Sequence, residues 1–230
     1  MLEEGLSYPT QGDKWIGRFI IGAALTFFSF LILPAVFIFG YFIHILEATI
    51  AGKEEPPEWE NWGNIFVDGL KGIAVTIVYS IVPFVVFGTI AVVLFGAGGA
   101  AGESGGGLIA GLGLLTLLMM FPAMFIVYYF IPAALGNMAR EGTFGAAFNV
   151  EVLRDIAFNS DYLVAVLLPI IVSLVINAVT TFLAFTVIGL VFVPFVAFYG
   201  QLAIFHMFGI AFRERVNRTT TRDTVGATAV

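Results

Sequence analysis

Long apolar runs constrain this chain more than any other feature of its sequence. They cover residues 16–51, 72–95, 108–138 and 163–212. A helix needs about 20 apolar residues to cross the hydrocarbon core of a bilayer. Hydrophobic residues make up 60% of the chain and charged residues only 11%, which is too few charges to cover a water-soluble fold. The sequence therefore predicts an all-α, polytopic transmembrane helix bundle and excludes soluble, disordered and fibrous proteins.

The positions of the basic residues predict how the chain is threaded. Lysine and arginine stand just before or within the start of the first run, between residues 53 and 71, between residues 140 and 154, and after the last run. Residues 96–107 contain none. Because basic residues collect on the cytoplasmic side of a membrane protein, we expect both termini in the cytoplasm and an even number of spans.

A repeated proline supports this threading. Pro34, Pro122 and Pro194 each stand about one membrane thickness before the next polar or charged stretch, so each is expected in the first turn of a helix that returns to the cytoplasm. The last run is expected to turn at Gly189. The alternative to six spans is five, with the first run forming one long, kinked helix. The six spans form three hairpins, over residues 16–51, 72–138 and 163–212.

Two amphipathic segments, residues 58–70 and 144–157, predict helices that lie in the cytoplasmic interface. Thr143 is the candidate N-cap of the second helix. Such helices either pack on the bundle or contact lipid headgroups or a partner protein. The candidate interfacial anchors are Trp59, Trp62, Phe66, Phe144 and Phe148.

The remaining segments are polar or rich in glycine. Residues 1–15 are expected to form a cytoplasmic N-terminal segment, residues 96–107 a flexible outer loop, and residues 213–230 a disordered cytoplasmic tail. These three segments and the membrane domain, residues 16–212, make up the predicted organisation of the chain.

The charge balance is acidic, with 16 acidic and 10 basic residues and a net charge of −6. This balance excludes nucleic-acid binding, which needs a basic face. An acidic, lysine-poor surface suits a salt-rich cytoplasm, so we expect a halophilic archaeal source. The chain has no cysteine, which excludes disulfides, thiolate metal sites and cysteine nucleophiles.

The region after the first apolar run also carries a motif. It reads Gly40-Tyr41, then a charged stretch, then Pro57-x-Trp59-x-Asn61-Trp62-Gly63-x-x-Phe66-x-x-Gly69-Leu70. This pattern resembles the prokaryotic membrane family catalogued as domain of unknown function 4013. The resemblance covers roughly residues 5–215 and is best over the first 75 residues. It implies a multi-pass membrane protein and brings no activity, cofactor or substrate with it.

Polar residues within the apolar runs are the candidates for a functional site. Tyr41, Tyr129 and Gln201 each stand seven residues after a repeated proline, and Asn177 is expected at a similar depth. These candidate midplane residues could line a path for a small solute. They could equally bridge neighbouring helices by hydrogen bonds.

The sequence carries no catalytic signature. His44 and His206 are the only histidines. We expect His44 to reach the cytoplasmic interface together with Glu47, and His206 to form a hydrogen bond between packed helices. Ser104 and His206 are expected too far apart for a nucleophile and its base. We therefore expect no enzyme activity and no catalytic, cofactor or metal site.

These observations together predict an integral protein of the cell membrane that binds lipid or a protein partner at its cytoplasmic face. One alternative is a small-solute transporter or channel that uses the polar midplane residues. Another is an intramembrane hydrolase. The expected partners are the lipid bilayer and a membrane or cytoplasmic protein, and the sequence does not define the oligomeric state.

Overall fold

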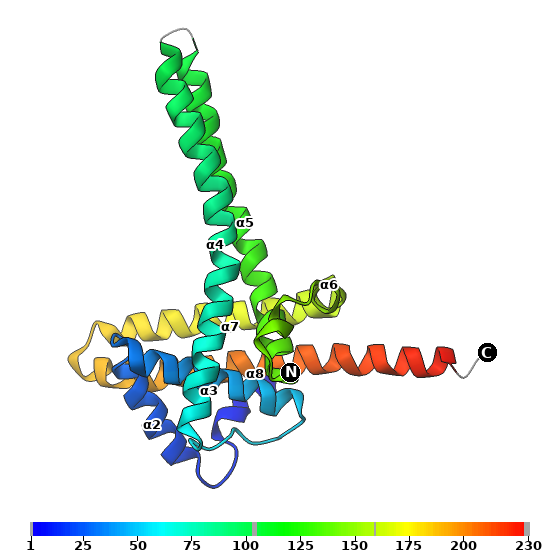
Figure 1. The fold of residues 1–230 in the computed structure, drawn as a ribbon. Helices are drawn as coiled ribbons and strands as arrows, with labels where there is room; N and C mark the ends of the chain where they lie inside the picture. Colours follow the sequence, from blue (N-terminus) through cyan, green and yellow to red (C-terminus); the bar gives the residue numbers. More distant parts are fainter. Residues whose placement is uncertain (1, 103–104, 159, 228–230) are drawn as a thin grey trace. The chain divides into compact units, whose positions relative to one another are not determined.

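The computed structural model describes residues 2–102, 105–158 and 160–227 of the chain. Every element in these ranges is helical, as the sequence predicts (Figure 1). The chain divides into a first unit, Met1–Ile73 with Pro132–Val230, and a second unit, Ala74–Ile131. The elements are α1 (Leu2–Ser7), η1 (Tyr8–Thr10), α2 (Trp15–Phe27), α3 (Ile32–Ile50), α4 (Trp62–Ala101), α5 (Gly106–Glu141), η3 (Phe144–Phe148), α6 (Val150–Ala157), α7 (Ser160–Ala184) and α8 (Val187–Ala227).

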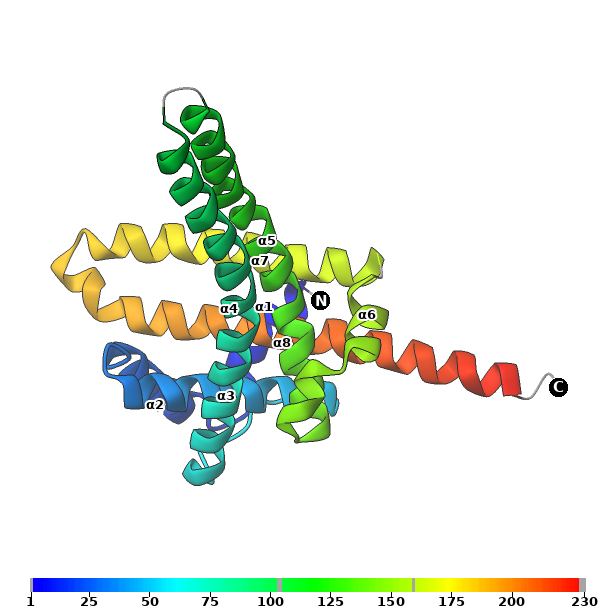
Figure 2. The same ribbon diagram turned by 45° about the horizontal axis from the view of Figure 1, so that its top comes forward.

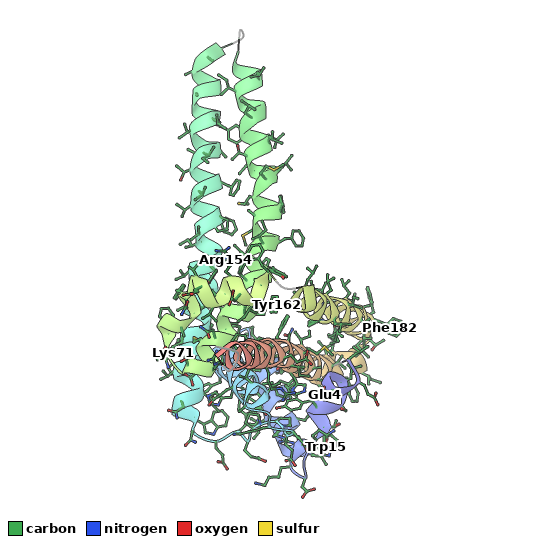
Figure 3. All side chains as sticks on the ribbon, turned by 90° about the vertical axis from the view of Figure 1, so that its right-hand side faces the viewer. Glu4, Trp15, Lys71, Arg154, Tyr162 and Phe182 are labelled. Atoms are coloured by element: carbon green, nitrogen blue, oxygen red, sulfur yellow. The ribbon has the colours of Figure 1, made fainter. Side chains whose placement is uncertain are left out.

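Five helices in the described part of the chain are long and apolar enough to cross a membrane. They are α3, α4, α5, residues Val166–Ala184 of α7 and residues Val187–Glu214 of α8. The most apolar windows of α4 and α5 are only 11% and 6% buried within the protein. Apolar side chains project outwards along these helices and at the end of α7, where Phe182 is 75% exposed (Figure 3). Apolar surface on this scale needs lipid as its solvent, so the chain is a polytopic helical membrane protein.

The first apolar run forms two helices, α2 and α3, joined by a turn at residues 28–31. In this turn Leu31 N–H donates to Phe28 O at 2.9 Å, and Leu31 is extended. The alternative of one long, kinked helix is therefore wrong. Helix α2 has 13 residues and spans about 20 Å at 1.5 Å per residue, against a hydrocarbon core of about 30 Å. The number of spans is therefore six if α2 crosses the membrane and five if it does not.

The last apolar run breaks at Phe185 and Thr186, not at the predicted Gly189. The hydroxyl oxygen of Thr186 accepts a hydrogen bond from Gly189 N–H at 2.9 Å, and Thr186 N–H donates to Leu183 O at 3.0 Å. Thr186 therefore caps α8, because a threonine oxygen can satisfy an otherwise unpaired N–H of the first turn. Helices α7 and α8 then run side by side (Figures 1 and 2).

The repeated prolines do not occupy equivalent positions. Pro34 lies in the first turn of α3, as predicted. Pro122 and Pro194 lie inside α5 and α8, well after these helices begin at Gly106 and Val187. For these two the prediction is wrong, because long apolar sequence on both sides keeps the backbone helical around a proline in membrane helices.

The predicted interfacial helix over residues 58–70 is not a separate helix. Residues 58–61 are not helical, and α4 begins at Trp62 and continues unbroken to Ala101. The reason is that Lys71 and Gly72 continue the helix, since a single glycine weakens a helix without ending it. Residues 62–70 are therefore the first turns of a long helix.

The second predicted interfacial helix, residues 144–157, is divided into η3 and α6 at Asn149. The side chain of Asn149 accepts a hydrogen bond from Val152 N–H at 3.3 Å and caps α6. Thr143 precedes η3 but forms no capping hydrogen bond with its side chain. The predicted cap was wrong because Asn149 offers its oxygen one element later in the chain.

The second unit is an antiparallel hairpin of α4 and α5 (Figure 2). Glycines let the two helices approach closely near its tip, where a Cβ atom on Gly98 would lie 3.0 Å from both Gly106 O and Ala110 N. Helix α4 extends to Ala101 for this reason, and the predicted outer loop 96–107 is largely helical. Residues 103–104 of that loop lie outside the described residues.

The predicted disordered tail, residues 213–230, is helical to Ala227 as the end of α8. No proline follows Pro194 in the sequence, so nothing in the backbone forces the helix to stop. Residues 228–230 lie outside the described residues.

The core of the first unit is built around α3. Helices α3 and α4 cross with their backbones in contact at Gly40 and Gly69, where an added Cβ would collide with the carbonyl oxygens of Ile65 and Val36. Only glycine permits this approach. The buried cluster on this crossing consists of Tyr8, Ile38, Tyr41, Phe42, Ile45, Trp59, Ile65, Phe198 and Leu202.

Candidate functional site

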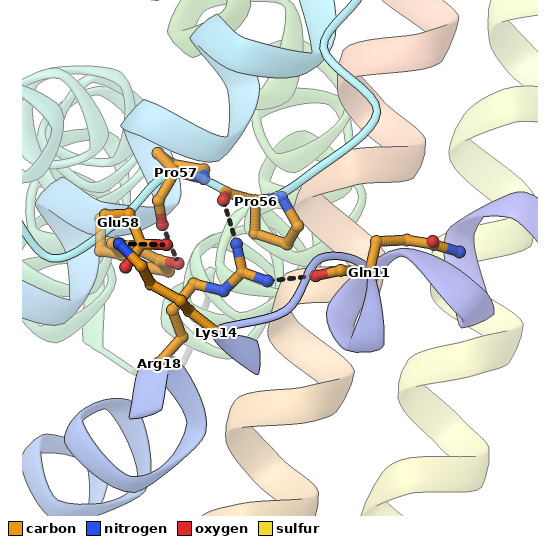
Figure 4. Close-up of polar contacts among 7 residues, drawn as sticks. Gln11, Lys14, Arg18, Pro56, Pro57 and Glu58 are labelled. Atoms are coloured by element: carbon orange, nitrogen blue, oxygen red, sulfur yellow. Dashed lines mark hydrogen bonds and ion pairs between the residues drawn. The ribbon is translucent and has the colours of Figure 1, made fainter. Parts of the chain in front are cut away.

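The loop between α3 and α4 is held against the first unit by a buried arginine. Arg18 is 3% exposed, and its guanidinium donates to the backbone carbonyls of Pro56 and Gln11 (Figure 4). The indole N–H of Trp59 donates to Arg18 O at 3.1 Å. The phenol of Tyr41 donates to Pro57 O at 2.7 Å. Three hydrogen bonds, at Pro56 O, Pro57 O and the Trp59 indole, thus hold the loop in place.

A polar cavity of about 650 Å³ lies between this loop, the second half of α3, the first turns of α4 and the last turns of α5. All of these segments belong to the first unit. Carboxylates outnumber lysines in the cavity lining by four to two. The acidic residues of the lining are Glu47, Glu58, Glu60 and Asp68. The basic residues are Lys53 and Lys71, and His44 also lines the cavity.

Three side chains meet on the wall of this acidic cavity. Asp68 Oδ2 lies 3.1 Å from His44 Nε2, and Asp68 Oδ1 accepts from Lys71 Nζ at 2.9 Å. The three side chains are only partly exposed, at 17% for His44, 27% for Asp68 and 33% for Lys71. Sequence analysis did not predict this cluster. The sequence feature that could have indicated this cluster is the pair of glycines at the crossing, since His44 stands one turn after Gly40 and Asp68 stands next to Gly69.

The predicted interfacial aromatics of the first segment form a stack that runs from the core to the surface. Trp59 is buried at 7% exposure and stacks on Tyr41 with ring centroids 3.9 Å apart. Trp62 is 42% exposed and stacks on Trp59 at 5.4 Å. Phe66 contacts Phe37 of α3. Trp59 thus packs inside the protein, because its indole N–H has a buried carbonyl partner.

In the second predicted segment, Phe144 and Phe148 both lie on η3. Their rings meet edge to face with centroids 5.3 Å apart, and Phe144 is 39% exposed. This pair remains accessible beside α6.

The four candidate midplane residues do not line the acidic cavity. Tyr41 is fully buried in the aromatic stack. Gln201 is exposed on α8, and Asn177 is exposed on α7, where its amide donates to Ser173 O of the same helix at 2.8 Å. Tyr129 belongs to the second unit, where it contacts Phe130.

The predicted packing hydrogen bond of His206 is present. His206 is 3% exposed, and its Nδ1 lies 2.8 Å from the hydroxyl of Thr49 on α3. Ser104 lies outside the described residues. Among the residues that the structure describes, there is no group of three or more histidine, aspartate or glutamate side chains that could hold a metal ion.

Comparison with known proteins gives one match. A family model described as "Protein of unknown function (DUF4013)" matches residues 27–185, which is more than two thirds of the chain. All residues that line the acidic cavity fall within the match, whereas η1 and α8 fall outside it. No curated protein and no solved structure matches the chain.

Proposed function

The chain belongs to the DUF4013 family of proteins of unknown function, and from this premise we propose that it binds a protein partner through a positively charged segment of that partner. We propose further that it is a non-enzymatic, multi-pass protein of the cell membrane with both termini in the cytoplasm. The orientation follows from the basic residues, because lysines and arginines between spans collect on the cytoplasmic side.

The acidic cavity is the single observation that carries this proposal. Its carboxylates exceed its lysines by two, and its volume of about 650 Å³ accommodates more than one side chain of a partner. Asp68 is already engaged by His44 and Lys71. Glu47 and Glu60 are exposed at the cavity, so they are the carboxylates best suited to receive a lysine or arginine.

A lipid headgroup is the second candidate occupant. The exposed rings of Trp62 and Phe144 favour it, because aromatic side chains are enriched at the depth of the headgroups. A net negative cavity disfavours the phosphate that every phospholipid headgroup carries, which is why we prefer a basic protein segment.

The polar residues that a transport function would need do not share one position, so they do not support that alternative. A solute path needs polar groups that face one channel. Tyr41 is enclosed by Trp59, and Asn177 donates to its own helix.

The test is a binding measurement on the full chain in nanodiscs. A fluorescent peptide rich in lysine and arginine serves as the probe, and its affinity is compared for the wild type and the double variant Glu47→Gln, Glu60→Gln. Each exposed ion pair is worth up to about 1 kcal/mol, so loss of both carboxylates should weaken binding by up to roughly thirtyfold. The control is Glu151→Gln, which removes an exposed carboxylate outside the cavity.

The outcomes separate the candidates. Weaker binding by the double variant and unchanged binding by the control support the proposal. Equal affinities for all three proteins contradict it. Affinity that depends on the anionic lipid content of the nanodisc, and not on Glu47 and Glu60, would show that the peptide binds the bilayer and would also contradict the proposal.

A further inference from the structure

A second cavity, of about 360 Å³, lies in the first unit between the N-terminal segment, the loop after α3, and α8. Tyr8 comes from η1, Lys53 from the loop, and His206 and Arg213 from α8. Lys53 is the one residue that also lines the acidic cavity. The two cavities have otherwise separate linings, so a ligand of the second cavity is independent of the partner proposed for the first.

The N-terminal segment forms a built wall of this cavity. The rings of Tyr8 and His206 are stacked with centroids 3.6 Å apart and an interplanar angle of 11°. The phenol of Tyr199 on α8 donates to Leu6 O. Tyr8 and His206 are 2% and 3% exposed, so both side chains are fixed by packing.

His206 lines the cavity and carries a buried nitrogen without a hydrogen-bond partner. Its Nδ1 is paired with the hydroxyl of Thr49 at 2.8 Å. Which partner donates depends on the imidazole tautomer; we assign the hydroxyl as the donor, which leaves the imidazole proton on Nε2. His206 Nε2 is buried and has no hydrogen-bond partner. A buried donor without a partner is destabilising unless a ligand or water supplies an acceptor.

Tyr8 lines the same cavity and carries a second buried polar atom. Its phenol oxygen is also buried and forms no hydrogen bond of ordinary geometry. The Thr49 side chain lies near this phenol, but the two groups form no hydrogen bond of ordinary geometry. The side chains of Tyr8 and His206, both more than nine-tenths buried, thus each hold a polar atom without a hydrogen-bond partner.

The charged residues of the lining indicate which chemical groups a ligand of this cavity would carry. Lys53 and Arg213 add positive charge beside the two neutral donors. Arg213 is held in position by Thr49 O at 3.3 Å and by Glu4 at 4.0 Å. Glu4 and Glu54 bring two carboxylates to the same cavity. Four donors or cations suit an oxyanion, and the two carboxylates suit an ammonium group.

We propose that this cavity binds an aminoalkyl phosphate, with the phosphate accepting from His206 and Tyr8 and the ammonium group facing the carboxylates. The source of this group is either the headgroup of an aminophospholipid or a free aminoalkyl phosphate. Both sources present the same chemistry to the cavity.

The test uses the full chain labelled with ¹⁵N-histidine in phosphatidylcholine nanodiscs. Because the chain has only two histidines, two sets of imidazole ¹⁵N signals are expected, each with an Nδ1 and an Nε2, and His44→Gln assigns them. The soluble probes are glycerophosphoethanolamine and inorganic phosphate, and the lipid probe is phosphatidylethanolamine built into the nanodisc. The variant is Tyr8→Phe, which keeps the ring that stacks on His206 and removes the donor. The matched control is Tyr128→Phe, whose phenol is 56% exposed in the second unit.

The expected result is a shift of the His206 Nε2 signal with glycerophosphoethanolamine or with phosphatidylethanolamine, while the His44 signal stays in position. A shift with the lipid alone identifies the headgroup as the source, and a shift with the soluble compound identifies a free ligand. Tyr8→Phe should weaken binding at least about fivefold, since a lost hydrogen bond to a charged group is typically worth that factor or more, and Tyr128→Phe should leave it unchanged.

Three results would overturn the proposal. The first is a His206 signal that no probe shifts, which would mean that the cavity holds water only. The second is equal affinity of the wild type and Tyr8→Phe. The third is equal affinity for inorganic phosphate and glycerophosphoethanolamine, which would remove the ammonium group from the assignment.

Discussion

The crossing of α3 and α4 at Gly40 predicts a large effect from a very small substitution. In Gly40→Ala the new methyl group would collide with Ile65 O and would lie 2.7 Å from Ile65 C and 2.9 Å from Gly69 N. Ordinary contacts between such atoms are about 3.5–4.0 Å. The three neighbours are backbone atoms, so no side chain can rotate away, and the two helices must move apart.

The cost follows from what lies at that crossing. Ile65 and Val36 are 0% and 3% exposed, so separation of the helices opens buried contacts. Overpacking in a well-packed core costs about 1–3 kcal/mol, and more when the backbone itself must move. We expect a loss of about 3 kcal/mol, which corresponds to a fall in Tm of roughly 6–12 °C for a protein of this size.

The assay is thermal unfolding in detergent, followed by tryptophan fluorescence, because Trp59 and Trp62 lie beside the crossing. The matched control is Gly88→Ala in the middle of α4, where an added Cβ would have no neighbour within 4 Å. This control should melt at or above the wild-type temperature, since alanine favours a helix over glycine by about 1 kcal/mol. A Tm for Gly40→Ala equal to that of Gly88→Ala would refute the reasoning.

Three further predictions concern other parts of the first unit. Arg18→Gln removes the charged donors to Pro56 O and Gln11 O, so it should cost about 2 kcal/mol or more and make residues 51–61 sensitive to limited proteolysis, whereas Lys14→Gln should not. Thr186→Ala removes the cap of α8 and should lower the Tm by roughly 2–4 °C for about 1 kcal/mol; an unchanged Tm would contradict this role. Burial raises the pKa of Tyr8 to about 12 from an ordinary value of 10, so ionisation of this phenol costs the fold nothing below pH 10 and destabilises it progressively as the pH rises towards 12. The difference is worth up to about 3 kcal/mol, and the Tm of Tyr8→Phe should therefore fall less than that of the wild type over this range, whereas parallel curves would contradict it.

The features that could be predicted from the sequence are those set by composition and local pattern. Apolar runs of helical length predicted an all-α membrane protein, and the first run divides in two as expected. Thr186 was missed because a glycine three residues later offered a stronger turn signal, although threonine is a favoured residue at the start of a helix. The proline repeat misled for a similar reason, because proline is tolerated inside membrane helices.

The candidate site depends on contacts between distant segments, which no local pattern contains. Trp59 was predicted at an interface from its neighbours in sequence, but the hydrogen bond to Arg18 O and the stack on Tyr41 bury it. His44 and Asp68 are 24 residues apart and meet because two glycines let α3 and α4 touch. Tyr8 and His206 meet across almost the whole chain. In each case the partner is decided by tertiary packing.

The central claim is that lipid surrounds most of this polypeptide while its basic clusters share one side. Single-cysteine labelling tests it most directly, because the chain has no cysteine of its own and each introduced thiol is then unique. Glu60→Cys and Thr219→Cys should react with an impermeant maleimide from the same side of sealed vesicles, and Gly99→Cys from the other side. Reaction of Glu60→Cys and Thr219→Cys from opposite sides would contradict the account.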